Sequence, residues 1–208
     1  MSTYNTNFLH PFNETTLGPI QGDEALFLYG LCQMVKPQVV LEIGCLIGQS
    51  LRVWINSGVP FVYAVDAVIS PDVWELRRGQ GSNKMVCLEQ DMTAPIDFLY
   101  GIPDLVFVDA SHKLADNIQV VKNLQYALRP GALFILHDTG HRKDEHVPAE
   151  DRWILSKDKW SEELQAWVLE PDEKATADWI SKNTNWQRID LWTTVVPRCG
   201  LTVFQVPN

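Results

Sequence analysis

Residues 38–50, QVVLEIGCLIGQS, decide the fold of this chain. The first six are almost all apolar and partly β-branched, which is typical of a strand buried on both faces. A loop with two glycines, Gly44 and Gly48, follows directly and leads into a helical pattern over residues 48–57. A strand, a glycine loop and a helix in this order predict the first unit of a parallel α/β sheet.

The same alternation continues along the chain. Helical spacing of Leu26, Phe27, Leu31 and Met34 predicts a first helix over residues 23–35. Further strands are expected at residues 61–65, 85–88, 105–108 and 132–136, and helices at 71–78 and 114–128. Two β-rich runs, 189–196 and 201–206, predict a closing antiparallel hairpin. The expected fold is α/β: a Rossmann-like, doubly wound, mostly parallel seven-stranded sheet with right-handed crossovers.

Residues 139–188 break this rhythm. They contain no strand-like apolar run and are rich in charge and tryptophan, so we expect a helical insertion or lid inside one domain that spans residues 1–208. Trp160 and Trp167 are seven residues apart, which would place them on one helical face. Such a face would pack a helix onto the sheet, or alternatively wall a substrate pocket. Six of the eight tryptophans lie in or just after this segment: Trp153, Trp160, Trp167, Trp179, Trp186 and Trp192.

Composition restricts the partners. The chain has 26 acidic and 17 basic residues, and its formal charge of −9 would repel a phosphate backbone, so we expect no nucleic-acid partner. Its four cysteines form no C-x-x-C pair, which favours a reducing cytoplasm. No apolar run approaches the ~20 residues that a bilayer crossing needs, so we expect no membrane association.

The loop chemistry favours a cationic ligand. A dinucleotide loop reads G-x-G-x-x-G, whereas here Leu46 stands between Gly44 and Gly48, and Glu42 would repel a pyrophosphate. Asp66 ends the second expected strand, where a carboxylate can bind ribose hydroxyls. Asp91 follows the third expected strand, where it could hold an adenine amino group. Three carboxylates at successive strand ends predict a site for an adenosine that carries positive charge.

At these residues the sequence resembles the class I S-adenosylmethionine-dependent methyltransferases. The pattern E-I-G-x-x-x-G-x-S at residues 42–50 is similar to the small-molecule O-methyltransferases of the catechol and caffeoyl-coenzyme A type and their bacterial relatives. The resemblance covers about residues 18–138 and the final hairpin. It implies transfer of a methyl group from S-adenosylmethionine to a hydroxyl of a small molecule, with the cofactor bound by Glu42, Gly44, Gly48, Ser50, Asp66, Asp91 and Met92.

The resemblance also implies a metal-assisted acceptor site. Asp109 and Asp138 end the fourth and fifth expected strands and match the aspartates that hold Mg²⁺ or Ca²⁺ in such enzymes, and Mn²⁺ would suit them as well. Thr139 replaces the family's asparagine, so the metal requirement stays open, and nearby histidines would permit a transition metal. His112 stands where the catechol-type enzymes carry a basic lysine. Its ordinary pKa near 6.5 suits a general base, so His112 and Asp109 are the candidate catalytic residues.

The sequence leaves open the roles of several residues and several alternative functions. Asp109 could simply cap the following helix, and His112 could be structural. His137 reads as a packed, hydrogen-bonded residue, and His141 and His146 as solvated lid residues. The alternatives to a methyltransferase are a nicotinamide-dependent oxidoreductase, a non-catalytic protein that keeps the fold, or a metal-dependent hydroxylase. The sequence fixes neither the acceptor nor whether the chain forms a homodimer.

Overall fold

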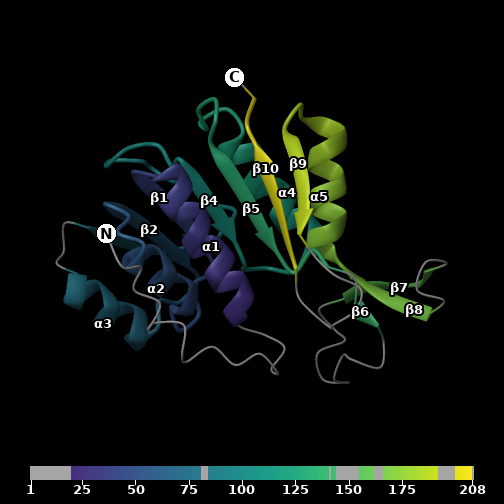
Figure 1. Cartoon of the computed structure of the whole chain (residues 1–208), viewed down its shortest axis with the longest axis horizontal. Coiled ribbons are helices and arrows are strands. Elements are labelled where there is room, and N and C mark those ends of the chain that lie inside the picture. Colours follow the sequence, from purple (N-terminus) through teal and green to yellow (C-terminus); the bar gives the residue numbers. More distant parts are fainter. Residues whose placement is uncertain are drawn as a thin grey trace.

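The computed structural model describes residues 20–80, 84–140, 142–143, 155–161, 166–191 and 200–207 (Figure 1). Its centre is a seven-stranded sheet with the order β3-β2-β1-β4-β5-β10-β9. The strands are β1 (Val39–Ile43), β2 (Phe61–Asp66), β3 (Met85–Glu89), β4 (Leu105–Val108), β5 (Leu133–His137), β9 (Gln187–Leu191) and β10 (Leu201–Gln205).

The sheet is parallel from β3 to β5 and antiparallel at its other end. β1 pairs in parallel with both β2 and β4, while β10 pairs antiparallel with β5 on one side and β9 on the other. The chain therefore places its last strand between β5 and β9. This confirms the mostly parallel seven-stranded sheet with an antiparallel C-terminal pair. The turn expected at residues 197–200 lies outside the described residues except for Gly200.

Helices cover both faces of the sheet, so its central strands are buried on two sides. The helices α1 (Gly22–Val35), α2 (Gln49–Asn56) and α3 (Pro71–Gln80) share one apolar core with the sheet, to which Leu28, Trp54 and Val73 belong. The helices α4 (Leu114–Leu124) and α5 (Asp172–Asn183) share the other core, through residues such as Val121 and Ile180. Burial on both faces explains the near-continuous apolar runs of β1, β4 and β5.

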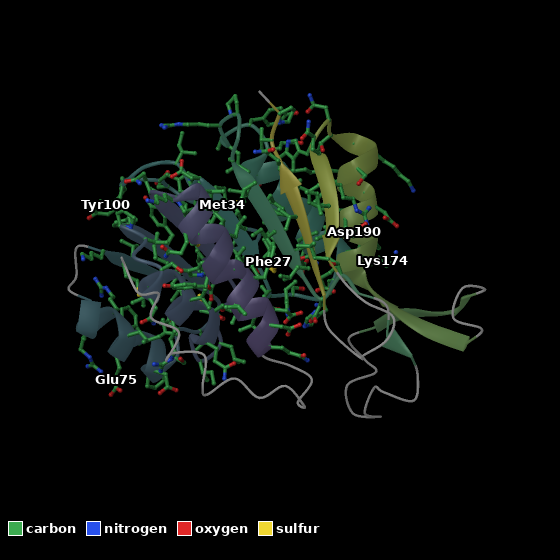
Figure 2. The ribbon with its side chains drawn as sticks, viewed as in Figure 1. Phe27, Met34, Glu75, Tyr100, Lys174 and Asp190 are labelled. Carbon is green, nitrogen blue, oxygen red and sulfur yellow. The ribbon has the colours of Figure 1, made fainter. Side chains whose placement is uncertain are left out.

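Helix α1 forms where predicted, but it buries a different face. Ala25, Leu28 and Leu31 pack into the core, whereas Leu26 and Met34 are 51 % and 75 % exposed. Figure 2 labels Phe27 and Met34 on this helix, in front of the sheet. The prediction from apolar spacing is right for Leu31 and wrong for Leu26 and Met34, because the buried face includes Glu24, which a hydrophobicity pattern does not mark as core.

The expected helical insertion is wrong for residues 142–143, 155–161 and 166–171. The strands β6 (Arg142–Lys143), β7 (Leu155–Ser161) and β8 (Ala166–Pro171) form a separate three-stranded sheet, and among the described residues of this segment α5 alone is helical (Figure 1). Trp160 and Trp167 are cross-strand partners in β7 and β8, not neighbours on a helix. β7, with the sequence LSKDKWS, has no apolar run, whereas β8 begins with the apolar run AWVL, which the prediction took as part of a helix.

No helix in the described part of the chain is long and apolar enough to cross a membrane.

Candidate functional site

The glycine loop after β1 lies against the end of β4. Gly44 has φ +88°, a conformation that favours glycine, and its N–H donates to the carbonyl of Val65 over 2.8 Å. A Cβ at Gly44 would lie 1.9 Å from the backbone oxygen of Asp109. The glycine is therefore required by contact between two strand ends as well as by its backbone angle, and it brings the loop beside Asp109.

Asp66, the last residue of β2, anchors the same loop. Its Oδ2 accepts hydrogen bonds from the N–H groups of Cys45 and Leu46, at 2.8 and 3.1 Å, and its Oδ1 accepts one from Val68 at 3.3 Å. The carboxylate is half-buried, so it still has room for further hydrogen bonds. Asp66 thus joins the ends of β1 and β2 at the predicted position. Leu46, which has φ +43° and an exposed side chain, projects from the loop that Asp66 holds.

Glu42 is placed beneath the loop and does not face its crevice. The side chain is fully buried, accepts a hydrogen bond from Ser50 Oγ over 2.7 Å, and accepts another from Trp54 Nε1. Burial raises the pKa of Glu42 to about 8, against the opposing effect of these two donors. Direct contact of Glu42 and Ser50 with a cofactor stays a prediction, because both side chains are buried and paired with each other in this structure. Both residues fasten α2 to β1 and so support the loop from below.

The two remaining cofactor residues follow β3. Asp91 is exposed, and its Oδ1 accepts hydrogen bonds from the backbone N–H and the hydroxyl of Thr93, which lower its pKa. Met92 is half-buried and lines a cavity of about 180 Å³ together with Ile43, Phe98, Val120 and other mainly apolar residues. Asp91 and Met92 therefore come from the strand end next to that of Asp66.

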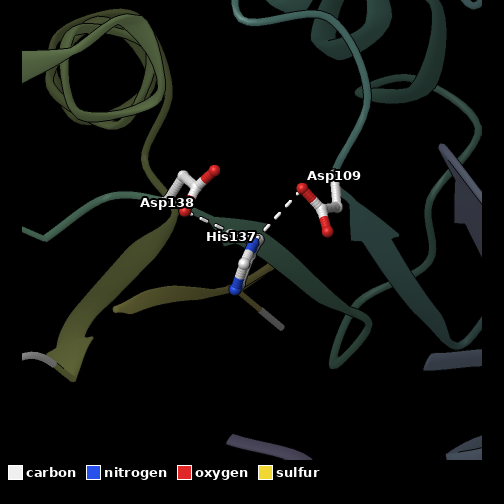
Figure 3. Close-up of side chains that lie close together, drawn as sticks. All are labelled: Asp109, His137 and Asp138. Carbon is white, nitrogen blue, oxygen red and sulfur yellow. Dashed lines mark ion pairs between the residues drawn. The ribbon is translucent and has the colours of Figure 1, made fainter. Parts of the chain in front are cut away.

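An acidic cluster lies at the ends of β4 and β5, where Asp109 and Asp138 were expected to meet (Figure 3). His137 stands between them: its Nδ1 is 3.2 Å from Asp109 Oδ1 and 3.6 Å from Asp138 Oδ1. One ligand atom from each of the three residues lies within 4.8 Å of the others, which would suit a metal ion. Asp138 has φ +59°, a strained conformation for a residue with a side chain.

The other nitrogen of His137 points at α1. Its Nε2 is 3.0 Å from Oε2 of Glu24, and the ring is completely buried. Burial opposes protonation, but Asp109, Asp138 and Glu24 outweigh it and raise the pKa of His137 well above its ordinary value. His137 is thus packed and hydrogen-bonded, as the sequence indicated. Its position inside the acidic cluster was not predicted.

His112 is held by a residue from α5. Its Nδ1 lies 2.6 Å from Oε1 of the buried Glu173 and 3.9 Å from Oδ2 of Asp138. Burial lowers the pKa of His112, but the stronger attraction of Glu173 and Asp138 raises it to about 9. This corrects the argument from an ordinary pKa: His112 in the unliganded protein is an imidazolium at neutral pH, and it can accept a proton only in alkaline solution.

Two expected roles find no support in the geometry. The hydroxyls of Thr139 and Thr202 are 2.8 Å apart, and Thr202 also lies 2.7 Å from Oδ1 of Asp190. Since Thr202 has one hydrogen to give, and the carboxylate can only accept, the hydroxyl of Thr139 donates to Thr202. Thr139 is therefore engaged with β10 through its hydroxyl. Asp109 does not cap α4, because its N-cap position is Lys113.

Sequence reasoning missed both outer carboxylates, Glu24 and Glu173. Glu24 reads as an ordinary helix-capping residue, and it does serve α1 in this way, with its side chain accepting from the N–H of Gln21. Glu173 lies in the segment that was interpreted only as a charged, tryptophan-rich helical insertion. Only contact with histidines far away in sequence reveals their second role. His141, His146, Trp153 and Trp192 lie outside the described residues.

Comparison with solved structures identifies the fold. TomG, an O-methyltransferase from Streptomyces achromogenes in complex with SAM, matches with a TM-score of 0.63 and 14 % identity over 91 % of this chain and 82 % of its own. A candidate caffeoyl-CoA O-methyltransferase from Staphylococcus aureus gives 0.64 and 15 % over 93 % and 87 %. The N-methyltransferase NodS from Bradyrhizobium japonicum, with SAH, gives 0.59 and 15 % over 92 % and 89 %.

No protein-family model matches the sequence, and a sequence search of curated proteins finds no relative. The structural matches nevertheless cover nearly the whole chain at TM-scores near 0.6. The chain therefore has the fold of the class I S-adenosylmethionine-dependent methyltransferases.

Proposed function

We propose that this chain transfers a methyl group from S-adenosylmethionine to a hydroxyl of a small molecule. The observation that carries the proposal is the contact between the glycine loop and the acidic cluster. Gly44 packs on the backbone of Asp109, so a cofactor on the loop and an acceptor at the cluster would lie side by side. A methyl donor and its acceptor oxygen must meet at roughly 3 to 3.5 Å before reaction.

The residues present fit the cofactor. The loop offers backbone without side-chain bulk at Gly44, and Asp66 stands at the strand end where ribose hydroxyls would bind. Asp91 and Met92 follow the next strand and would face the adenine. S-adenosylmethionine supplies a methyl group on a positively charged sulfur, which acidic surroundings tolerate. The structural matches include proteins with SAM or SAH bound.

The acceptor end fits a cation. Asp109 and Asp138 bring two carboxylates to either side of His137, and a cation among them would offset their mutual repulsion. A divalent ion there would supply Lewis acidity to the acceptor hydroxyl. His112, held by Glu173 beside Asp138, is placed to exchange a proton at this end of the site once it is deprotonated.

The rival functions fit less well. A nicotinamide-dependent sheet is parallel throughout and uses a G-x-G-x-x-G loop, whereas β10 is antiparallel here and the loop holds Leu46. A non-catalytic role was suggested by the loss of asparagine at Thr139. His137 weakens that argument, because it adds a third ligand atom to the cluster without Thr139.

The remaining proposals concern context. We propose a small hydroxylated acceptor, no nucleic-acid partner because of the charge of −9, and a cytoplasmic location because the four cysteines suggest no disulfide framework. Oxygen as the atom that receives the methyl group is also part of the proposal, since the structural matches include an N-methyltransferase.

Calorimetric titration with S-adenosylhomocysteine and with NADH tests the cofactor. We expect one site for S-adenosylhomocysteine and no binding of NADH. Methyl transfer is then followed by mass spectrometry over a panel of phenols, catechols and sugars, in chelator and with added Mg²⁺, Ca²⁺ or Mn²⁺. Binding of NADH alone would overturn the proposal, and cofactor binding without turnover of any acceptor would favour the non-catalytic alternative.

A further inference from the structure

We propose that Asp109, Asp138 and Nδ1 of His137 bind a first-row transition-metal ion in preference to Mg²⁺ or Ca²⁺, and that Glu24 is the positioning residue that turns Nδ1 toward this ion. The inference rests on the proposed function in one respect, because it names the class of metal at the acceptor end. It also assigns a role to Glu24 on α1, which is far from the other three residues in sequence.

Nδ1 of His137 makes no hydrogen bond in the described structure, although the ring is 0 % exposed. The same nitrogen lies within ion-pair distance of the carboxylates of Asp109 and Asp138. A buried polar atom without a hydrogen bond is costly unless something else satisfies it. Here Nδ1 points between Asp109 and Asp138 (Figure 3). Two carboxylates that face one buried ring nitrogen call for positive charge between them, which a proton on Nδ1 or a metal ion in its place would supply.

Glu24 determines the tautomer of His137, that is, which ring nitrogen carries the hydrogen. Nε2 of His137 lies 3.0 Å from Oε2 of Glu24, and the same oxygen accepts a hydrogen bond from the backbone N–H of Gln21. An ionised carboxylate can only accept, so Nε2 carries the hydrogen. In a neutral ring Nδ1 is then left with its lone pair. A carboxylate behind a ligating imidazole is the usual arrangement in metal sites, where it fixes ring orientation and increases ligand basicity.

Glu24 is itself held rigidly. Its Oε1 accepts from the N–H of Gly200 over 2.9 Å, and its Oε2 accepts from the N–H of Gln21 over 3.0 Å. Three elements therefore hold this one carboxylate: the start of α1, the start of β10 and the end of β5. A side chain fixed in this way can define the direction of the imidazole, which a mobile surface carboxylate could not do.

The donor set combines a nitrogen with carboxylate oxygens. The separations of Nδ1 from the two carboxylate oxygens, 3.2 and 3.6 Å, are close to those of neighbouring ligands around an ion with bonds of roughly 2.0–2.2 Å. One imidazole and two carboxylates suit Mn²⁺, Fe²⁺, Co²⁺ or Zn²⁺, whereas Mg²⁺ and Ca²⁺ prefer oxygen alone. The nitrogen is thus the feature that would distinguish this site from an all-oxygen one.

Metal binding to the purified full chain tests the proposal without cofactor or acceptor. Calorimetry should give one site for Mn²⁺, Co²⁺ and Zn²⁺, with affinity at least tenfold above that for Mg²⁺ and Ca²⁺. Pulsed EPR of the Mn²⁺ complex of the wild-type chain should show coupling to a directly bound nitrogen. This second readout needs no variant, so it stays informative if substitution of the buried His137 prevents folding.

Two matched variants test the positioning role. Glu24→Gln should weaken Mn²⁺ binding about 10- to 100-fold, the usual effect of losing a partner behind a ligand. Asp23→Asn removes the same charge from the neighbouring exposed position of α1 and should change affinity less than threefold. Glu24→Asp, which keeps the carboxylate, should recover part of the loss. Circular dichroism checks that each variant is folded.

Three results would overturn the proposal. Mg²⁺ or Ca²⁺ binding as tightly as Mn²⁺, with no nitrogen coupling, would show an all-oxygen site. Absence of any metal binding would leave His137 as a packed residue paired with a proton. Equal losses in Glu24→Gln and Asp23→Asn would reduce Glu24 to a general charge effect. S-adenosylhomocysteine is titrated into the same samples, so that failure of the methyltransferase proposal is seen separately from failure of the metal site.

Discussion

Nδ1 of His112, just beyond β4, lies 2.6 Å from Oε1 of Glu173 in the first turn of α5. This contact joins the end of the central sheet to the helix that follows the small β6–β8 sheet. A carboxylate that holds one nitrogen of an imidazole orients the ring and stabilises its charged form. The pair therefore determines when His112 can act as a base.

Loss of Glu173 should move the pH dependence of activity. The pKa of His112 is about 9, so a reaction that needs neutral His112 should become faster as pH rises toward 9. Glu173→Gln removes the carboxylate that stabilises charged His112. The rise of kcat/KM with pH should therefore move from about pH 9 toward pH 6.5, and a larger fraction of His112 should be neutral at pH 7. Asp178→Asn removes a charge from the same helix, where it faces Arg188, and should leave this rise in place. An unchanged rise in Glu173→Gln would show that His112 is not the base.

Buried Glu42 should make the folded protein less stable as pH rises. Its pKa is about 8 in the folded chain and near 4.5 when exposed, so folding binds a proton between these values. The stabilisation is complete below pH 4.5 and is lost as pH rises through 8, by roughly 1.4 kcal/mol for each unit of pKa shift. Glu42→Gln should reduce the decrease of unfolding free energy with rising pH, because glutamine does not ionise. The glutamine amide can still donate to Ser50 and accept from Trp54, so the packing is kept.

Urea unfolding between pH 5 and 9 measures the effect. Glu75→Gln is the control, because Glu75 is an exposed residue that pairs only with Arg78 at 3.6 Å. Its unfolding free energy should change with pH as that of the wild-type chain does. Parallel slopes for the wild-type chain and Glu42→Gln would mean that the carboxyl is ionised throughout and that burial is not the dominant influence.

The centre of the main sheet could be predicted from sequence because the strands β1, β4 and β5 are buried on both faces. Runs such as LVFV in β4 favour a strand, and the acids that follow them were assigned to the correct strand ends. The small β6–β8 sheet was missed because β7, LSKDKWS, mixes charged and apolar residues, and the apolar run AWVL of β8 was interpreted as part of a helix. The partners of His137 and His112 were equally hidden. Glu24 and Glu173 reach them only through the packing of α1 and α5, and no local pattern encodes a contact across 113 residues.

Gly44 should be far more sensitive to substitution than another glycine with the same backbone angle. Gly44→Ala adds a Cβ 1.9 Å from the Asp109 backbone oxygen, so the ends of β1 and β4 must separate. Gly58 has φ +79° and nothing within 4 Å of its missing Cβ, so Gly58→Ala should cost only the backbone strain of about 1–2 kcal/mol. Gly44→Ala should cost more than this in urea unfolding. Similar losses for the two variants would show that the loop does not press on β4.

Asp66 should contribute to cofactor binding through two effects, one direct and one through the loop. Asp66→Ala removes the predicted ribose acceptor, and two lost charge-assisted hydrogen bonds should weaken S-adenosylhomocysteine binding by roughly 2 to 4 kcal/mol. It also frees the N–H groups of Cys45 and Leu46, which are held at 2.8 and 3.1 Å.

Asp66→Asn separates these effects. The amide oxygen can still accept from the loop, but the side chain no longer offers a charged acceptor to the ribose, so binding should weaken less than in Asp66→Ala while thermal stability stays closer to wild type. Asp72→Asn, an exposed residue in the first turn of α3, is the matched control and should bind as the wild-type chain does. If S-adenosylhomocysteine binds all three variants with wild-type affinity, Asp66 serves only to anchor the loop, and the ribose must be held by residues other than this carboxylate.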